Sequence, residues 1–212
     1  AVLADSVYKK GANARLNEVN KHYPGRFEIL ESGGNYATFK DKETGKIHFA
    51  IPGTDIHDTR NNRLKDLGTD LLVTLGLHKL GNRYRSADKK FKEVLKEHGK
   101  ENINLAGHSL GGTIVSELSH KYDVEGHSFN RGGTHHTFRG NTFKQFHSSH
   151  SERAKKNHVY LTMPSASGSI IDPLSLGTAI DPLANIHWVE PKKLKKNQQG
   201  VVSHHSINHF KP

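Results

Sequence analysis

The sequence contains no cysteine, which excludes disulfide bonds, a thiolate nucleophile and a zinc site built on sulfur. No apolar run approaches the roughly 18 residues that a transmembrane helix requires. Residues 1–10 also lack the continuous apolar stretch of a signal peptide. The only methionine is Met163, so we expect a processed product, a domain excised from a longer precursor or a mature secreted form. Because a chain without cysteine suits either redox compartment, the sequence leaves localisation open.

The composition is basic and lean in apolar residues. Lys and Arg number 31 against 21 Asp and Glu, a formal net charge of +10, and 17 histidines add positive charge as the pH falls toward about 6. Only 33% of the residues are hydrophobic, but 20 glycines separate alternating apolar segments, which indicates a folded chain rather than a disordered one. The length fits a single domain over residues 1–212, and the oligomeric state is left open.

Helical and strand patterns alternate along the chain. Apolar residues at helical spacing predict helices over residues 5–23, 86–98 and 113–122. Short apolar or alternating segments predict strands at 27–32, 35–40, 46–51, 102–106, 126–129, 158–163 and 187–190. Because strands that alternate with helices form parallel sheets, we expect α/β architecture with a mostly parallel central sheet flanked by helices.

The strongest chemical signal is the segment Gly107-His108-Ser109-Leu110-Gly111. It follows a predicted strand and precedes a predicted helix, which is the setting of the G-x-S-x-G nucleophile elbow. A serine on such a turn is strained and needs small neighbours, a need that Gly107 and Gly111 meet. The Leu110 N–H, at the start of the helix, would face a developing oxyanion. The alternative interpretation is a glycine-rich turn whose serine caps the helix.

The segment Ala106–Gly112, AGHSLGG, resembles the elbow of class 3 lipases, the fungal-type triacylglycerol lipase family. Segments that resemble other motifs of this family occur in the same order, and the resemblance covers roughly residues 35–210. These segments are FAIPGTD at 49–55, DLGTDL at 66–71, FNRGG at 129–133, IDPLS at 171–175 and HSINHF at 205–210. The resemblance implies an α/β-hydrolase fold and hydrolysis of carboxylic esters in lipids.

The sequence departs from the family pattern at three places. Pro52 stands where the family usually has arginine before its Gly-Thr pair, and Leu67 stands where tryptophan is common. Residues 134–157, rich in Gly, His, Ser and Lys, have no counterpart in the family. These departures affect the expected substrate more than the expected chemistry. Phospholipase A1, neutral lipase and general esterase or acyltransferase activities therefore all stay open.

A serine nucleophile needs a base within hydrogen-bond reach and an acid that orients the base. Hydrolases of this fold carry the three residues in the order Ser, Asp or Glu, His. With Ser109 as nucleophile, the resemblance implies Asp172 as the acid. Asp181, in a second Asp-Pro-Leu triplet, is the alternative, although an Asp-Pro turn would also explain that residue.

Three histidines near the C-terminus compete for the role of general base. The resemblance implies His205, which begins the HSINHF segment, and His204 and His209 are the alternatives. With 17 histidines in the chain, only the place in the motif singles out His205. His108, inside the elbow, is expected to be structural because its ring would point sideways from the nucleophile.

An oxyanion hole needs two hydrogen-bond donors. The Leu110 N–H is the first of them. The resemblance implies Thr54 as the second, through its N–H and its hydroxyl. The alternative for the pair Gly53-Thr54 is an ordinary turn at the end of a strand.

Residues 71–85 lie where the family has its lid. Their apolar residues, which begin with Leu71-Leu72-Val73, would suit contact with lipid. The alternative for this segment is a helix that covers the sheet. Lid behaviour is therefore a hypothesis that the position and composition of the segment suggest.

The positive charge has two interpretations. It suits an anionic membrane surface, where each basic residue contributes about 1 kcal/mol, and Lys192–Lys196 is the densest basic cluster. The alternative is a nucleic-acid-binding or interaction module on a hydrolase-like scaffold, to which the aromatic and basic residues 138–146 are loosely suited. We favour peripheral contact with a membrane and a lipid ester substrate.

Metal and cofactor binding have little support in the sequence. The histidines that would gather a transition metal are His135, His136, His147, His150, His204 and His205. The H-E-x-x-H spacing of a zincin does not occur. We therefore expect neither a metal nor a cofactor in the mechanism.

Overall fold

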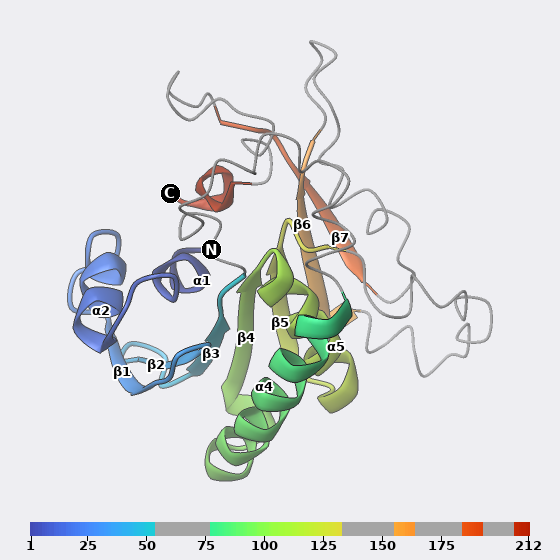
Figure 1. Cartoon of the computed structure of the whole chain (residues 1–212). Coiled ribbons are helices and arrows are strands. Elements are labelled where there is room, and N and C mark those ends of the chain that lie inside the picture. The colour runs from blue at the N-terminus through green and yellow to red at the C-terminus, as the bar shows by residue number, and fades with distance from the viewer. Residues whose placement is uncertain (54–76, 133–154, 164–183, 193–205) are drawn as a thin grey trace.

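A computed structural model of the chain describes residues 1–53, 77–132, 155–163, 184–192 and 206–212, with the backbone alone for 77–81. The strands in these ranges form one seven-stranded sheet, in which neighbours in the chain are neighbours in space. They are β1 (Phe27–Ser32), β2 (Ala37–Asp41), β3 (Ile47–Ile51), β4 (Ile103–His108), β5 (Glu125–Phe129), β6 (Asn157–Thr162) and β7 (Asn185–Val189). Strands β1 to β3 pair antiparallel and β3 to β7 pair parallel (Figure 1). The expected α/β architecture with a mostly parallel sheet is confirmed.

Helices lie on both faces of the sheet. They are α1 (Val2–Ser6), α2 (Ala12–Asn20), α4 (Leu77–His98), the 3₁₀ turn η3 (Lys100–Asn102), α5 (Leu110–Tyr122) and the 3₁₀ turn η8 (Ile207–Phe210). Helices α4 and α5 cover one face, and α1 and α2 cover the other face near β1 to β3 (Figure 1). Among the helices that the structure describes, none is long and apolar enough to cross a membrane.

The face beneath α4 and α5 holds the first apolar core. Alternate residues of β3 and β4 point toward these helices, because side chains alternate along a strand. The buried members are Ile47, Phe49, Ile51, Ala87, Phe91, Val94, Ile103, Leu105, Ile114, Val115, Leu118 and Val124. The rings of Phe49 and Phe91 lie 5.5 Å apart and join β3 to α4. Since each large buried side chain contributes about 1.5–3 kcal/mol, this core holds both helices on the sheet.

A second core, on the opposite face, joins α1 and α2 to the first strands. Its buried members are Val2, Leu3, Val7, Val19, Phe27, Ala37, Phe39 and Ala50. The C-terminal turn η8 lies beside α1, where the Lys211 ammonium is 2.7 Å from the Asp5 carboxylate. Ile207 of η8 packs with Ala106 and Phe129 in a smaller buried cluster. The C-terminal turn therefore covers β4 and β5 on the same face as α1.

The single helix predicted over residues 5–23 is wrong. The chain forms two helices there, α1 and α2, separated by residues 7–11. Gly11 has a φ of 88°, which an α-helix does not allow. Val7, which directly follows α1, and Val19, within α2, are nevertheless buried in the same core. Their spacing therefore imitates one continuous amphipathic helix.

Helix α4 extends further toward the N-terminus than the predicted helix 86–98. Residues 77–85, the larger part of the segment 71–85, are helical and continuous with the rest of α4. Tyr84 packs, partly buried, against the first core. This part of the segment is therefore a helix over the sheet, the alternative to a lid, while 71–76 lie outside the described residues.

Candidate active site

Ser109 lies at the junction between β4 and α5, at the edge of the sheet where the parallel strands end. Its backbone has a φ of 55° and a ψ of −125°, a combination that residues with a Cβ rarely adopt. Such a conformation costs about 1–3 kcal/mol and persists only when its surroundings enforce it. Here the Ser109 N–H donates to the Phe129 carbonyl of β5 at 3.0 Å. The strained turn predicted for the G-x-S-x-G segment is present.

The Ser109 side chain does not cap α5. The residue occupies the N-cap position, but its hydroxyl accepts no hydrogen bond from the first turn of the helix. The Ser109 carbonyl instead accepts the Thr113 N–H at 3.1 Å, as in any helix. The interpretation of Ser109 as a helix-capping serine is therefore wrong, and its side chain is partly exposed at the sheet edge.

Leu110 is the first residue of α5. Its N–H therefore has no acceptor within the helix, because that acceptor would lie four residues earlier. N–H groups at a helix N-terminus carry partial positive charge and stabilise anions that lie against them. The position of Leu110, directly after the serine, is the one that the sequence predicts for the first oxyanion donor.

Two glycines allow the turn around Ser109 to pack closely. A Cβ on Gly107 would approach the backbone of Gly111 and lie 2.8 Å from the Gly112 nitrogen. A Cβ on Gly111 would meet the end of β3, 2.6 Å from the Pro52 carbonyl oxygen. Backbone atoms, unlike side chains, have no rotamer change that relieves such contacts. The predicted need for small residues at both positions is confirmed.

Gly53, directly after β3, lies against the elbow. A Cβ at this position would be 2.9 Å from the Ser109 Cβ and 2.8 Å from the His108 carbonyl oxygen. The Gly53 N–H donates to the Tyr8 hydroxyl at 2.9 Å. The Gly-Thr segment therefore begins beside the serine, although Thr54 itself lies outside the described residues.

His108 is buried, and its Nδ1 lies 2.8 Å from the Tyr8 hydroxyl. The same hydroxyl accepts the Gly53 N–H at 2.9 Å. Burial and the contact with Tyr8 suit the structural role predicted for His108, which stays a prediction. Tyr8 is a residue of the site that the sequence analysis missed, since 100 positions separate it from His108 and no local pattern signals the pairing.

Residues 129–132 of the FNRGG segment lie at the same edge of the sheet. Asn130 has a φ of 39°, and its side-chain oxygen accepts the Thr162 N–H at 3.0 Å. Its own N–H donates to the Tyr160 carbonyl at 2.8 Å. The Gly132 carbonyl accepts the Thr113 hydroxyl at 3.3 Å, which ties the segment to α5. The segment thus joins the carboxyl ends of β5 and β6 to the helix that begins at the serine.

Most of the other predicted site residues lie outside the described part of the chain. They are Thr54, the acid candidates Asp172 and Asp181, and the base candidates His204 and His205. The nucleic-acid stretch 138–146 and the histidine tracts at 135–150 also lie outside it. Their roles stay predictions. Within the described ranges, no group of three or more His, Asp or Glu side chains is placed to hold a metal ion.

His209, the one base candidate that the structure describes, is buried in η8. Its Nδ1 accepts the Lys192 N–H at 3.1 Å. A backbone N–H only donates, so this Nδ1 carries no proton, and the proton of the neutral ring is on Nε2. A triad base needs the opposite arrangement, with a proton on Nδ1 for the acid and a bare Nε2 for the serine. The hydrogen bond therefore argues against His209 as the base.

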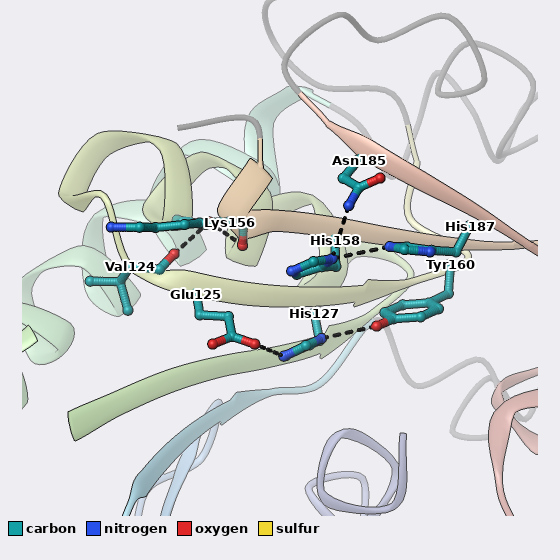
Figure 2. Close-up of polar contacts among 9 residues, drawn as sticks. Val124, Glu125, His127, Lys156, His158, Tyr160, Asn185 and His187 are labelled. Atoms are coloured by element: carbon teal, nitrogen blue, oxygen red, sulfur yellow. Dashed lines mark hydrogen bonds and ion pairs between the residues drawn. The ribbon is translucent and has the colours of Figure 1, made fainter. Parts of the chain in front are cut away.

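Figure 2 shows a second cluster of titratable side chains, on β5, β6 and β7. The His127 ring stacks 5.2 Å from His158, which stacks 5.3 Å from His187. The Glu125 carboxylate lies 3.1 Å from His127 Nε2, and His158 Nδ1 lies 3.0 Å from His187 Nε2. One of these two facing nitrogens donates and the other accepts, so the pair shares a proton. Burial lowers the pKa of His127 and of His158, so both rings resist protonation.

His48, on β3, leads to a prediction about pH. Burial lowers its pKa to about 4; Asp41 opposes this effect, and His127, Lys46 and Arg26 reinforce it. As the pH falls from about 6.5 to about 4, the unfolded chain binds more protons at this residue than the folded chain does. The free energy of unfolding therefore falls with pH over this window. The loss from His48 alone is on the order of 3 kcal/mol once the pH is below about 4.

We expect His48→Gln to remove most of this contribution. Urea unfolding at about pH 7.5 and about pH 4 measures the free energy of unfolding of both proteins. At the higher pH both are neutral at position 48, so they differ only in packing. At the lower pH, the free energy of unfolding of the wild type should fall relative to that of His48→Gln. A difference that is equal at the two pH values would contradict the prediction.

The described residues bring together, at one edge of the sheet, a strained serine, the first N–H of α5 and the Gly53 backbone. The chain matches no protein-family model, and no curated protein matches its sequence.

Proposed function

We propose that the protein is a serine hydrolase of the α/β-hydrolase fold that cleaves carboxylic esters of lipids through an acyl-enzyme. The proposal depends on the backbone of Ser109, whose φ of 55° and ψ of −125° belong to a strained turn between β4 and α5. Strained non-glycine residues cluster at functional sites, because the surrounding fold must stabilise them. A capping role, which would otherwise account for a serine here, is contradicted by the absence of a capping hydrogen bond.

In the proposed reaction, the Ser109 Oγ attacks the ester carbonyl while a histidine takes the serine proton. The Leu110 N–H and Thr54 stabilise the negative charge that develops on the carbonyl oxygen. The histidine then donates the proton to the departing alcohol, which leaves the acyl group on Ser109. Water, activated by the same histidine, releases the acid and restores the serine.

We assign the base to His205 and the acid to Asp172, as the resemblance to class 3 lipases implies. The Lys192 N–H supports this choice, because its hydrogen bond gives His209 the wrong tautomer for a triad base. His204 is the alternative base and Asp181 the alternative acid. Single substitutions of the four residues would distinguish them.

The charge of the protein supports a phospholipid substrate over a neutral lipid. The chain has a formal net charge of +10, and an anionic lipid surface attracts each nearby basic residue by about 1 kcal/mol. Phospholipase A1 activity is therefore our first choice, with triacylglycerol and small-ester hydrolysis as the alternatives. None of the described residues supplies an observation that favours a nucleic-acid-binding module.

A covalent probe and a lipid panel test the proposal together. A fluorophosphonate reacts with activated serines, so we expect a phosphonyl adduct on the peptide that contains Ser109, detected by mass spectrometry. We expect faster release of fatty acid from phosphatidylglycerol vesicles than from phosphatidylcholine vesicles or a triacylglycerol emulsion, because the protein is basic. Equal rates on the two kinds of vesicle would contradict the preference for anionic lipid.

Neighbouring histidines provide matched controls. His205→Ala should slow the labelling of Ser109 by about 100-fold or more, whereas His204→Ala should be labelled at the wild-type rate. An adduct on another residue of the wild type, or no adduct at all, would remove the central claim of the proposal.

A further inference from the structure

Arg83 of α4 reaches the backbone at the end of β3. Its Nη2 donates to the Pro52 carbonyl at 2.6 Å and to the Gly53 carbonyl at 3.2 Å, and its Nη1 donates to the Gly53 carbonyl at 3.3 Å. A guanidinium is a rigid planar fork, so hydrogen bonds to two adjacent carbonyls fix their direction as well as their position. Arg83 therefore fixes two peptide units that lie beside the elbow.

The Gly53 residue is also held from its other side. Its N–H donates to the Tyr8 hydroxyl at 2.9 Å, and that hydroxyl lies 2.8 Å from His108 Nδ1. The donor and the acceptor of one residue are thus bound by side chains from two distant parts of the chain. Because a Cβ at this residue would be 2.9 Å from the Ser109 Cβ, both restraints act directly beside the nucleophile.

The charge of Arg83 has an unusual setting. The side chain is partly buried, and burial lowers its pKa. A buried cation is ordinarily compensated by a carboxylate, whereas the described residues offer this guanidinium the Pro52 and Gly53 carbonyls. Its Nε has no hydrogen-bond partner among them. A cation held against backbone carbonyls beside a nucleophile is placed to stabilise negative charge that develops there.

We propose that Arg83 is a positioning residue of the candidate active site, which fixes the Pro52 and Gly53 carbonyls beside Ser109 and adds positive charge there. The inference rests on the proposed hydrolase function of Ser109. It assigns to α4 a part in transition-state stabilisation, in addition to its part in covering the sheet.

Steady-state kinetics on p-nitrophenyl butyrate, a soluble ester that avoids the membrane, test the inference. Arg83→Gln should lower kcat by about 10- to 100-fold and change KM by less than about twofold, because the oxyanion forms only in the transition state. Arg83→Lys keeps the charge but not the fork, so its kcat should lie between those of Arg83→Gln and the wild type. The matched control is Arg85→Gln, at an exposed position of the same helix, which should keep the wild-type kcat.

The melting temperature of each variant separates positioning from a purely structural role. If Arg83 only stabilises the fold, Arg83→Gln melts earlier but keeps the wild-type kcat below its melting temperature, and that result would overturn the inference. Where Arg83→Gln does not fold, a wild-type kcat in Arg83→Lys would overturn it. A wild type that neither hydrolyses the ester nor reacts with the fluorophosphonate would overturn the proposed function, and the role of Arg83 with it.

Discussion

Ser109→Ala is expected to abolish ester hydrolysis and to leave the fold intact. Removal of a triad nucleophile lowers kcat by about 10⁴- to 10⁶-fold in serine hydrolases, and the residual rate comes from the oxyanion hole and binding. The free energy of unfolding should change by less than about 0.5 kcal/mol, because the side chain makes no capping hydrogen bond and alanine keeps the same strained backbone. Lipid hydrolysis and urea unfolding of one preparation measure both quantities.

The matched control for this variant is Ser86→Ala, which removes the hydroxyl of an exposed serine of α4. It should keep both the activity and the stability of the wild type. Full activity in Ser109→Ala would place the nucleophile elsewhere. A loss of fold together with activity would show that the Ser109 hydroxyl supports the turn, which the geometry of the N-cap contradicts.

Gly111→Ala is expected to have the largest effect on stability. In an ordinary helix, replacement of glycine by alanine gains up to about 1 kcal/mol. Here the new Cβ would lie 2.6 Å from the Pro52 carbonyl oxygen and closer still to that of Ile51, and relief would require β3 to move away from α5. The steric term therefore outweighs helix propensity. We expect a net loss of about 3 kcal/mol, measured as a lower urea midpoint.

Gly34→Ala is the control for this substitution. A Cβ at Gly34 meets no atom within 4 Å, and the residue does not have a positive φ. Its free energy of unfolding should stay within about 0.5 kcal/mol of the wild type. A gain of stability in Gly111→Ala would contradict the close approach of α5 to β3, and with it the packing that holds Ser109 in its strained conformation.

The strands and the elbow were the most predictable parts of the molecule. The segment predicted at 27–32 coincides with β1, and the one at 46–51 differs from β3 by one residue. Each is a short apolar or alternating run bounded by turn residues, so its signal is local. The elbow is local in the same sense, since the strand, Ser109 and the glycines around it are consecutive.

Contacts between distant side chains could not be predicted. Tyr8 and Arg83 bind the Gly53 backbone from 45 and 30 residues away, and each is an ordinary residue within its own segment. The stacked histidines come one from each of β5, β6 and β7, and only the register of the sheet brings them together. Hydrophobic periodicity also misleads where two separate helices bury residues in one core. The residues that α1 and α2 bury together have the spacing of a single amphipathic helix.

The buried and stacked histidines also affect how the charge of the protein depends on pH. A count of 17 suggests a large uptake of protons between neutral and mildly acidic pH. Burial lowers the pKa of His48, His127 and His158. These three histidines therefore take up fewer protons near neutrality than the same residues would in an unfolded chain. If the protein binds an anionic bilayer as proposed, these three histidines add less to that attraction on mild acidification than three histidines of an unfolded chain would.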